Sequence, residues 1–272
     1  MGIKKQALLI GALGGLGSAT IKQLNDRGWH VFAADFQQEV FTVYEQINNV
    51  TPLLVDVTNT DAIKEAFDLI SRQTTGLDAV INMAGILKIG SLVECPVSDL
   101  TKTLEINLHG VYRVNKQFLP LILKQKGRII MLSSEVGRQT AAPFNGIYSI
   151  SKHALEAYSD ALRRELAFLG VKVVKIQPGP FKTTMTKNAE QLFIEAQKES
   201  THFKKNLAKG ISYLPKVYNN AHDPVYVAKA ILKALESANP KPAYTIKPDV
   251  TRKILNILPL KWADKLIKKR LS

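Results

Sequence analysis

The stretch that decides the fold is GALGGLG, residues 11–17, which directly follows an apolar run over residues 7–10 and opens a helical pattern over 16–27. Glycines at this junction permit a tight turn, and they let backbone N–H groups approach a pyrophosphate at the helix N-terminus. A glycine pattern alone is weak support for nucleotide binding, but its strand–turn–helix context strengthens it. We therefore predict a dinucleotide site formed by Gly11, Gly15, Leu16 and Gly17.

Short apolar runs alternate with longer helical patterns along most of the chain. Runs that suit strands buried on both faces cover residues 7–10, 30–34, 52–57, 78–82, 128–133 and 172–177. Helical patterns cover 16–27, 60–72, 99–123, 148–169, 182–209 and 223–237, and a last strand is expected at 243–246. This alternation predicts an α/β fold, a Rossmann-type doubly wound parallel sheet, in a single domain over residues 1–272.

Composition is ordinary for a soluble globular protein, with 46% hydrophobic and 22% charged residues. Cys95 is the only cysteine, so no intrachain disulfide forms and a reducing compartment is expected. The chain shows neither a signal-peptide pattern nor an apolar run of membrane-spanning length. We therefore expect a cytoplasmic protein without a metal site, whose contact with a membrane, if any, is peripheral.

The net charge of +14 is concentrated late in the chain, because residues 198–272 hold 16 Lys and Arg against 5 Asp and Glu. This favours an anionic partner, such as lipid headgroups or a carboxylated or phosphorylated substrate. A lysine-rich solvated surface explains the excess equally well. Since no nucleic-acid-binding motif and no interleaved aromatic residues accompany the basic residues, no nucleic-acid partner is expected.

Acidic residues close the second and third predicted strands. Asp35 ends the second strand, where a carboxylate accepts hydrogen bonds from the adenosine ribose and repels a 2′-phosphate. No Lys or Arg lies between residues 33 and 43, so NAD is predicted in preference to NADP. Asp56 and Val57 end the third strand, where they are expected to meet the adenine ring. Asp56 is equally well placed to cap the helix that begins near Asn59.

Tyr148 and Lys152 lie four residues apart on a predicted helix, so their side chains share one face. An ammonium group beside a phenol stabilises the phenolate and lowers the pKa of the tyrosine, which can then exchange a proton with an alcohol or carbonyl. Ser134, just past a strand end, offers a hydroxyl donor to the same oxygen. Many helices contain this spacing by chance, and its meaning here comes from the preceding nucleotide turn and Ser133-Ser134 strand end.

Six motifs in order resemble those of the short-chain dehydrogenase/reductase family, in its compact single-domain branch, over about residues 5–186. They are Gly11 with Gly15 and Gly17, Asn82-Met83-Ala84-Gly85, Asn107-Leu108-His109-Gly110, Ser133-Ser134-Glu135-Val136-Gly137, Tyr148-Ser149-Ile150-Ser151-Lys152, and Pro178-Gly179 with Thr183. Three features depart from the usual family pattern. Ile10 replaces the usual threonine of the glycine motif. The spacing of Gly11, Gly14 and Gly17 also fits the longer epimerase branch, and Ser134 lies about one residue further from Tyr148 than usual.

The resemblance implies a catalytic tetrad of Asn107, Ser134, Tyr148 and Lys152. Tyr148 would exchange the proton, Ser134 would orient the substrate oxygen, Lys152 would bind the nicotinamide ribose, and Asn107 would hold a water in a proton relay. The full set of expected cofactor contacts is Gly11, Gly15, Leu16, Gly17, Asp35, Asp56, Val57, Asn82, Ala84, Gly85, Tyr148, Lys152, Pro178, Gly179, Phe181 and Thr183.

Within that set the resemblance gives Asn82 the role of stabilising the central sheet. It places Pro178 and Gly179 against the nicotinamide, and Thr183 on the carboxamide of that ring.

The helix that begins at Tyr148 is most similar to that of hydroxysteroid and retinol dehydrogenases, which implies a small hydrophobic alcohol or ketone as substrate. Residues 180–215 are expected to cover the substrate. The expected substrate contacts are Ser134, Val136, Phe144, Tyr148 and Met185, and Phe181, Leu192 and Phe193 are further candidates for an apolar pocket. Packing of the covering helices among themselves explains many of these apolar positions equally well.

Residues 259–272 form a predicted basic amphipathic helix in which Leu260, Ala263, Leu266, Ile267 and Leu271 share one face. Such a helix either lies on an anionic membrane or covers the protein's own core or a subunit partner. The resemblance also implies a homodimer or homotetramer, assembled through the helices that contain Asn107 and Tyr148.

The leading hypothesis is therefore an NAD(H)-dependent oxidoreductase, an alcohol dehydrogenase or ketoreductase that acts on CH–OH groups. The alternative is a non-catalytic NAD(P)-binding sensor on the same fold. Intact Ser134, Tyr148 and Lys152 argue against the sensor, because it has no need of a tuned phenol.

Overall fold

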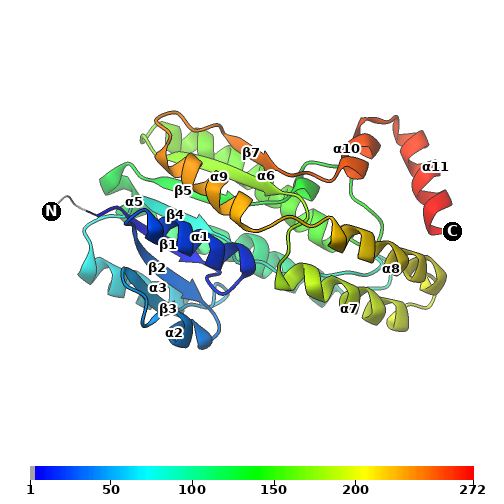
Figure 1. Cartoon of the computed structure of the whole chain (residues 1–272), viewed down its shortest axis with the longest axis horizontal. Coiled ribbons are helices and arrows are strands. Elements are labelled where there is room, and N and C mark those ends of the chain that lie inside the picture. The colour runs from blue at the N-terminus through cyan, green and yellow to red at the C-terminus, as the bar shows by residue number, and fades with distance from the viewer. Residues whose placement is uncertain (1–3) are drawn as a thin grey trace.

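Seven parallel strands form one sheet in the computed structural model, which describes residues 4–272 (Figure 1). In chain order they are β1 (Gln6–Ile10), β2 (His30–Asp35), β3 (Val50–Leu54), β4 (Ala79–Asn82), β5 (Arg128–Leu132), β6 (Lys172–Pro178) and β7 (Ala243–Ile246). Across the sheet the order is β3-β2-β1-β4-β5-β6-β7, so the strand order reverses between β1 and β4. Ligands of open α/β sheets bind at the carboxyl ends of the strands beside such a reversal. The predicted Rossmann-type single domain is confirmed.

Two helical layers cover the two faces of the sheet. The helices α1 (Gly15–Asp26), α2 (Glu39–Tyr44) and α9 (Val225–Glu236) pack on one face, and α3 (Thr60–Gln73), α5 (Val111–Gln125) and α6 (Gly146–Ala167) pack on the other. Because side chains alternate along a strand, Leu9 of β1 joins the first core while Leu8 and Ile10 join the second. The sheet is therefore buried on both sides, as its continuous apolar strands predicted.

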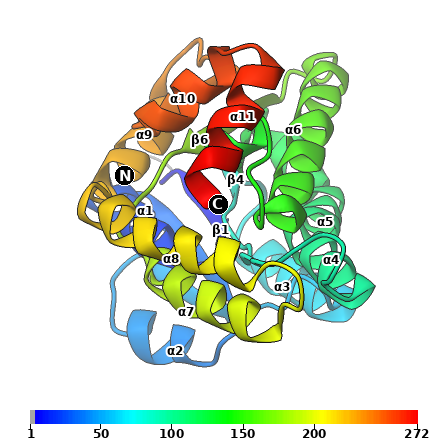
Figure 2. The same ribbon diagram turned by 90° about the vertical axis from the view of Figure 1, so that its right-hand side faces the viewer.

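Four helices lie beyond the carboxyl ends of the strands: α7 (Thr184–Glu199), α8 (Lys204–Asn219), α10 (Val250–Ile257) and α11 (Leu260–Leu271). Figure 2 faces this end of the molecule and shows α10 and α11 above α7 and α8. The Asn206 side chain of α8 donates a hydrogen bond to the Leu271 carbonyl of α11 at 2.8 Å, which ties the two pairs together. No helix within residues 4–272 is long and apolar enough to cross a membrane.

Several predicted boundaries are wrong. The third strand ends at Leu54, before Asp56 and Val57, since the Asp56 carboxylate turns back to accept hydrogen bonds from the Thr58 amide and hydroxyl. The helix expected over 99–123 divides into α4 (Val97–Leu104), the π-helical turn η1 (Glu105–Gly110) and α5.

The helix expected over 182–209 is also interrupted, at residues 200–203. The Glu94 carboxylate accepts hydrogen bonds there from the Ser200 hydroxyl and from the backbone amides of Thr201 and His202, and Ser200 in turn accepts one from the Phe203 amide. These bonds give the backbone amides of residues 201–203 partners outside a helix, so α7 ends before them and α8 begins after them. The short helices α2 and α10 were not predicted.

Candidate active site

The glycine turn at residues 11–17 is tightly constrained. Gly11 has a φ of 92°, in the left-handed region that favours glycine, and a Cβ there would lie 2.8 Å from the Ala84 nitrogen. A Cβ at Gly17 would collide with the Gly11 carbonyl oxygen. The turn therefore passes close to the second predicted motif, around Ala84. Its N-cap residue, Gly14, has no side chain to cap the helix, so the amides of the first turn of α1 remain for a ligand.

Asp35 lies at the carboxyl end of β2, next to this turn. Its Oδ2 accepts a hydrogen bond from the Leu13 amide at 2.9 Å, and its Oδ1 accepts one from the Gln37 amide at 3.3 Å. The side chain is buried. The carboxylate is thus fixed at the edge of the glycine turn, where the sequence predicted it.

Asp56 does not cap α3, so that alternative is wrong. The cap is Asn59, whose Oδ1 accepts from the amides of Asp61 and Ala62. Val57 is buried against Gly110, because a Cβ at Gly110 would lie 2.6 Å from Val57 Cγ2. Its side chain therefore belongs to the core around η1.

Asn82 lies inside the molecule, at the end of β4. Its amide donates to Asn115 Oδ1 of α5 at 2.9 Å, and Asn115 donates in turn to the Tyr158 hydroxyl of α6 at 3.2 Å. These bonds join the centre of the sheet to two covering helices. This arrangement agrees with the stabilising role that the resemblance gives to Asn82.

Asn107 lies in the π-helical turn η1 and is completely buried. Its Oδ1 accepts from the Ile86 amide at 2.8 Å, and its Nδ2 donates to the Ile86 carbonyl and to Ser151 Oγ, each at 3.0 Å. A Cβ at Gly85 would lie 3.2 Å from Asn107 Oδ1 and 3.7 Å from Lys152 Nζ. Single π turns are frequent at functional sites, and this one holds Asn107 beside α6.

Tyr148 and Lys152 start the helix α6, and Ser134 precedes the short 3₁₀ turn η2 (Glu135–Gly137). The Ser134 hydroxyl lies near the Tyr148 hydroxyl and lowers its pKa, and it accepts a hydrogen bond from the Val136 amide at 3.4 Å. The Lys152 ammonium donates to the Leu132 carbonyl at 2.9 Å and lies 5.7 Å from the centre of the Tyr148 ring. The structure therefore brings the predicted tetrad together at the ends of β4 and β5.

Burial shifts the pKa values of Tyr148 and Lys152 in opposite directions. Burial raises the pKa of Tyr148 to about 12, and the Ser134 hydroxyl and the positive charge of Arg252 oppose this rise. Burial lowers the pKa of Lys152 to about 8, against the opposing charge of Glu156. Lys152 is not among the groups that oppose the rise of the Tyr148 pKa, and its ammonium group donates to the Leu132 carbonyl. The lowering of the Tyr148 pKa by Lys152 therefore stays a prediction.

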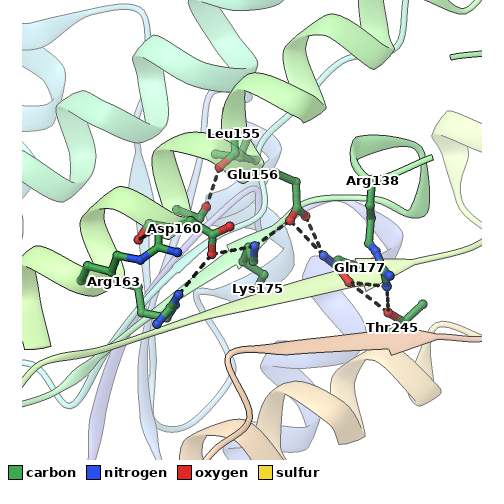
Figure 3. A network of polar contacts seen from close by, with 10 residues as sticks. Arg138, Leu155, Glu156, Asp160, Arg163, Lys175, Gln177 and Thr245 are labelled. Carbon is green, nitrogen blue, oxygen red and sulfur yellow. Dashed lines mark hydrogen bonds and ion pairs between the residues drawn. The ribbon is translucent and has the colours of Figure 1, made fainter. Parts of the chain in front are cut away.

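A polar network supports α6 from behind the site (Figure 3). Lys175 of β6 is buried and pairs with Glu156 at 2.8 Å and with Asp160 at 2.9 Å. The side-chain nitrogen of Gln177, Nε2, also donates to both carboxylate oxygens of Glu156, each at 2.9 Å. The side-chain oxygen of Gln177, Oε1, accepts hydrogen bonds from the Thr245 hydroxyl and from Arg138. Arg138 also donates to the Thr245 hydroxyl. The network fixes one turn of α6, directly after Lys152, to β6 and β7.

The Pro178–Thr183 segment leaves the end of β6 and reaches the glycine turn. The Gly179 amide donates to the Ile246 carbonyl at 2.9 Å, which holds the segment on β7. A Cβ at Gly15 would lie 3.3 Å from Thr183 Cγ2, so Thr183 lies against the glycine turn. Its contact with the nicotinamide carboxamide stays a prediction. Phe181 is different, since its ring is buried in the core with residues of α9. A contact between that ring and the cofactor is therefore a wrong prediction.

A cavity of about 670 Å³ lies beyond the carboxyl ends of the strands, and Gly146, two residues before Tyr148, is one of its lining residues. Neither Tyr148 nor Ser134 is among the described residues that line it. Residues 139–146, α10 and α11 supply most of its lining, whereas the predicted cover at 180–215 supplies Phe203 and Asn206. Phe144, an expected substrate contact, lines this cavity. Val136 is buried and Met185 is exposed, and neither is among the described residues that line it.

Two charged residues of the site were not predicted. Glu135, directly after Ser134, is buried and accepts a hydrogen bond from the Asp249 amide at 2.7 Å. Arg252 of α10 lines the cavity, and its Nε lies 3.9 Å from Glu135 Oε1. Burial raises the pKa of Glu135, while the Asp249 amide and Arg252 oppose the rise. Arg252 lies far from the motifs in sequence, so no local pattern could have identified it.

A family model described as short chain dehydrogenase matches residues 5–192. A probable short-chain type dehydrogenase/reductase of Helicobacter pylori, VdlC, is 34% identical over 268 residues, which are 96% of this chain and 96% of that protein. Rat 17-beta-hydroxysteroid dehydrogenase type 6 is 37% identical over 204 residues, 72% of this chain and 62% of that protein. The chain spans between 59% and 62% of the length of the first mammalian relatives that it matches.

The fold also has a close counterpart among solved structures. The crystal structure of a short chain dehydrogenase from Burkholderia cenocepacia, in complex with NADP, has a TM-score of 0.74 with this chain. The two are 22% identical in sequence, and the comparison covers 100% of both chains.

Proposed function

Because the chain belongs to the short-chain dehydrogenase/reductase family, as its motifs predicted, we propose that it interconverts a hydroxyl and a carbonyl group on a hydrophobic substrate with NAD(H). Its relatives include proteins named as 17-beta-hydroxysteroid and retinol dehydrogenases. The single observation that carries the proposal is the meeting of Tyr148, Ser134 and Lys152 at the carboxyl ends of the strands, the same end of the sheet as the glycine turn.

The glycine turn fits a dinucleotide. Gly11 packs against the backbone at Ala84, and Gly17 packs against the backbone of Gly11, so neither position has room for a side chain. The N-terminus of α1 offers amides and a partial positive charge to a pyrophosphate. Gly15, Leu16 and Gly17 would contact the phosphates through their backbone, and Thr183 would close over them from the end of β6.

Asp35 supports NAD over NADP. Its carboxylate is fixed by the Leu13 and Gln37 amides, so it cannot move away from a 2′-phosphate without losing both hydrogen bonds. No Lys or Arg lies between residues 33 and 43 to neutralise that phosphate. The Burkholderia relative binds NADP, so the preference of this chain rests on Asp35 alone.

The chemistry divides between the cofactor and the protein. A bound nicotinamide would accept or supply the hydride. Tyr148 would give its proton to the carbonyl oxygen of the substrate during reduction, and at neutral pH it is protonated because its pKa is about 12. Ser134 would donate a hydrogen bond to the same oxygen, which orients the substrate and stabilises the developing charge.

Alcohol oxidation requires the reverse proton transfer, to a phenolate. Ser134 and the positive charge of Arg252 both favour the ionised form of Tyr148. Asn107 holds the Ile86 backbone and Ser151 Oγ through three hydrogen bonds, and we assign it as a positioning residue for the Lys152 turn of α6. The oxidation rate should therefore rise with pH, as more of Tyr148 loses its proton.

The cavity supports a bulky apolar substrate. Its volume falls within the usual range for small-molecule sites, and the residues that line it are mainly apolar. These apolar residues include Leu92, Phe144, Phe203, Leu255, Ile267 and Leu271. A steroid- or retinol-like alcohol or ketone suits such a cavity.

The variant Tyr148→Phe tests the proposal. Loss of the phenol should reduce turnover of hydrophobic secondary alcohols and ketones by a factor of about 10² to 10⁴. The variant should bind NADH as the wild type does, as measured by the fluorescence of the nicotinamide. In the same assay, the wild-type protein should bind NADPH more weakly than NADH, which tests the role of Asp35. Tyr158→Phe is the matched control, since Tyr158 lies on the same helix but its hydroxyl contacts Asn115.

A wild-type protein that binds NADH but turns over no alcohol or ketone in a broad panel would support the sensor hypothesis instead. Equal affinity for NADH and NADPH would contradict the role assigned to Asp35. Equal losses in Tyr148→Phe and Tyr158→Phe would show a structural effect rather than a catalytic one.

A further inference from the structure

The two C-terminal helices carry a band of exposed apolar side chains. Five large apolar residues of α10 and α11 are between 50% and 74% exposed, and we call them the terminal apolar face: Val250, Ile254, Ile257, Trp262 and Leu266. Single exposed apolar residues are common on proteins, but five within one pair of short helices form a surface that water solvates poorly.

Each helix has an inner and an outer side. On α10, Leu255 and Asn256 line the substrate cavity, whereas Ile254 and Ile257 are exposed to solvent. The outer residues Val250, Ile254 and Ile257 follow the spacing of one helical face. The outer side of α10 is therefore separate from the side that closes the cavity.

The same division on α11 corrects the predicted amphipathic face. Ala263, Ile267 and Leu271 line the cavity, whereas Leu266 and Trp262 are exposed. Leu266 was expected to share one face with Ala263, Ile267 and Leu271, but it lies on the exposed side of the helix while the other three line the cavity. Ile254 and Leu266 line a shared crevice of about 490 Å³ between the two helices, and Leu255 and Ile267, which also line the cavity, form part of its wall.

Charge identifies the partner of this face. Residues 250–272 contain seven Lys and Arg and one acidic residue, Asp264. Lys253, Lys261, Lys265 and Lys269 are exposed around the apolar residues. A second copy of the chain, docked face to face, would bring two such basic rims together, because a two-fold interface pairs each patch with itself. An anionic surface instead satisfies both the charges and the apolar groups.

We propose that the terminal apolar face docks on an anionic lipid bilayer. The apolar side chains enter the boundary between headgroups and acyl chains, Trp262 lies at that interface, and the lysines contact the lipid phosphates. The helices lie on the bilayer and do not span it. Since the inner sides of the same helices form the cavity wall, docking brings the cavity next to the lipid phase. The proposal is independent of which substrate or cofactor the enzyme uses.

Tryptophan fluorescence tests the proposal directly, because the chain has two tryptophans and they differ in exposure. Trp29 is 3% exposed and reports on the core, whereas Trp262 is 67% exposed. Vesicles that contain phosphatidylglycerol should shift the emission of the full-length protein to shorter wavelength, and brominated acyl chains should quench it. Vesicles of pure phosphatidylcholine should have much less effect, and high salt should reverse the shift.

Two pairs of substitutions separate the apolar from the charged contribution. Ile254→Ser with Ile257→Ser should abolish cosedimentation with the anionic vesicles. Lys265→Gln with Lys269→Gln should weaken it by about fivefold for each lysine removed. All four positions are exposed, so the unfolding midpoint should not change. Phe168→Ser is the matched control, since Phe168 is 91% exposed but lies at the C-cap of α6, at the opposite edge of the sheet.

Three results would overturn the proposal. One is the absence of a spectral shift with anionic vesicles, and another is equal binding to pure phosphatidylcholine. The third is unchanged vesicle binding after the paired isoleucine substitutions, with normal folding. If sedimentation velocity instead shows a dimer that these substitutions dissociate, the face is an interface between two copies and the lipid proposal fails.

Discussion

Lys152 places an ammonium group in a buried position beside Tyr148, and this position has an energetic cost. Its pKa falls to about 8 in the folded protein, from 10.5 for an ordinary lysine. Between these two pH values the unfolded chain binds more protons than the folded chain, so the free energy of unfolding rises with pH. The rise amounts to roughly 3 kcal/mol at most. Tyr148 acts in the opposite direction, because its raised pKa lowers stability from about pH 10 to pH 12.

Lys152→Met should remove the Lys152 contribution while keeping an unbranched side chain. We expect the free energy of unfolding, measured in urea at a series of pH values, to rise less steeply between pH 8 and pH 10 in the variant than in the wild type. Lys64→Met, on the exposed side of α3, should keep the wild-type slope. Parallel curves for wild type and Lys152→Met would show that the lysine is solvated in the folded state.

Individual residues differ in how much their sequence context revealed. The spacing of Tyr148 and Lys152 correctly placed them on one helical face, and the family motifs identified Ser134 and Asn107. The same patterns could not show which atom each ammonium or amide contacts. Lys152 bonds to the Leu132 carbonyl, and Arg252 supplies the charge near Tyr148. Both facts depend on how distant segments pack, which the spacing of residues along one helix does not encode.

At the scale of elements, the attachment of α6 to β6 rests on a buried lysine. Lys175 would be an uncompensated charge in the sheet without Glu156 and Asp160. Glu156 also raises the pKa of Lys152, against the larger effect of burial. This network therefore connects the stability of the α6–β6 contact to the charge state of Lys152.

Glu156→Gln should weaken that contact. Because Asp160 remains as a partner for Lys175, the free energy of unfolding should fall by roughly 1–3 kcal/mol, less than the loss of a whole buried pair. The pKa of Lys152 should fall further, which a shift of the pH–rate profile would report. Asp26→Asn removes the acidic member of the exposed Lys22–Asp26 pair and should change stability little. A similar small effect of Glu156→Gln would contradict the structural role of the network.

The elements themselves were predicted where packing and local pattern agree. Buried strands and their covering helices have a periodic apolar pattern, so β1, β2, α1, α3 and α6 were found within a few residues. The π turn η1 and the break between α7 and α8 were not found. Each depends on side chains that bond across the fold, as Asn107 does with Ile86 and Glu94 does with Ser200.

At the scale of the whole molecule, the helices that line the cavity were not predicted to do so. Residues 180–215 leave the sheet at the correct edge, but α10 and α11 supply much of the lining. Their positions depend on contacts such as Thr140 with Asn256 and Asn206 with Leu271. Contacts between residues so far apart leave no periodic signal, and the motif pattern of the family ends before these helices begin.

A chain that ends at Leu258 tests whether α11 is a wall of the substrate cavity. Asn206 and Tyr213 of α8 hold α11 to the rest of the molecule, and Ala263 is its only buried residue within the described chain. Removal of α11 should therefore lower the unfolding midpoint only slightly. NADH affinity should not change, because the glycine turn lies on β1 and α1. The loss of Ile267 and Leu271 should raise the KM for a bulky apolar substrate about tenfold or more, with a smaller effect on kcat.

Trp262→Ser provides the control for that truncation, because it alters the outer side of α11 and leaves the cavity side intact. With substrate dissolved in water, this variant should keep the wild-type KM. An unchanged KM in the truncated chain would show that α11 does not contact the substrate, and the cavity wall would then consist of α10 and residues 139–146. A rise in KM for both variants would mean that the outer side also takes part in substrate binding. Only a rise confined to the truncated chain agrees with one helix that closes the cavity on its inner side and presents Trp262 and Leu266 on its outer side.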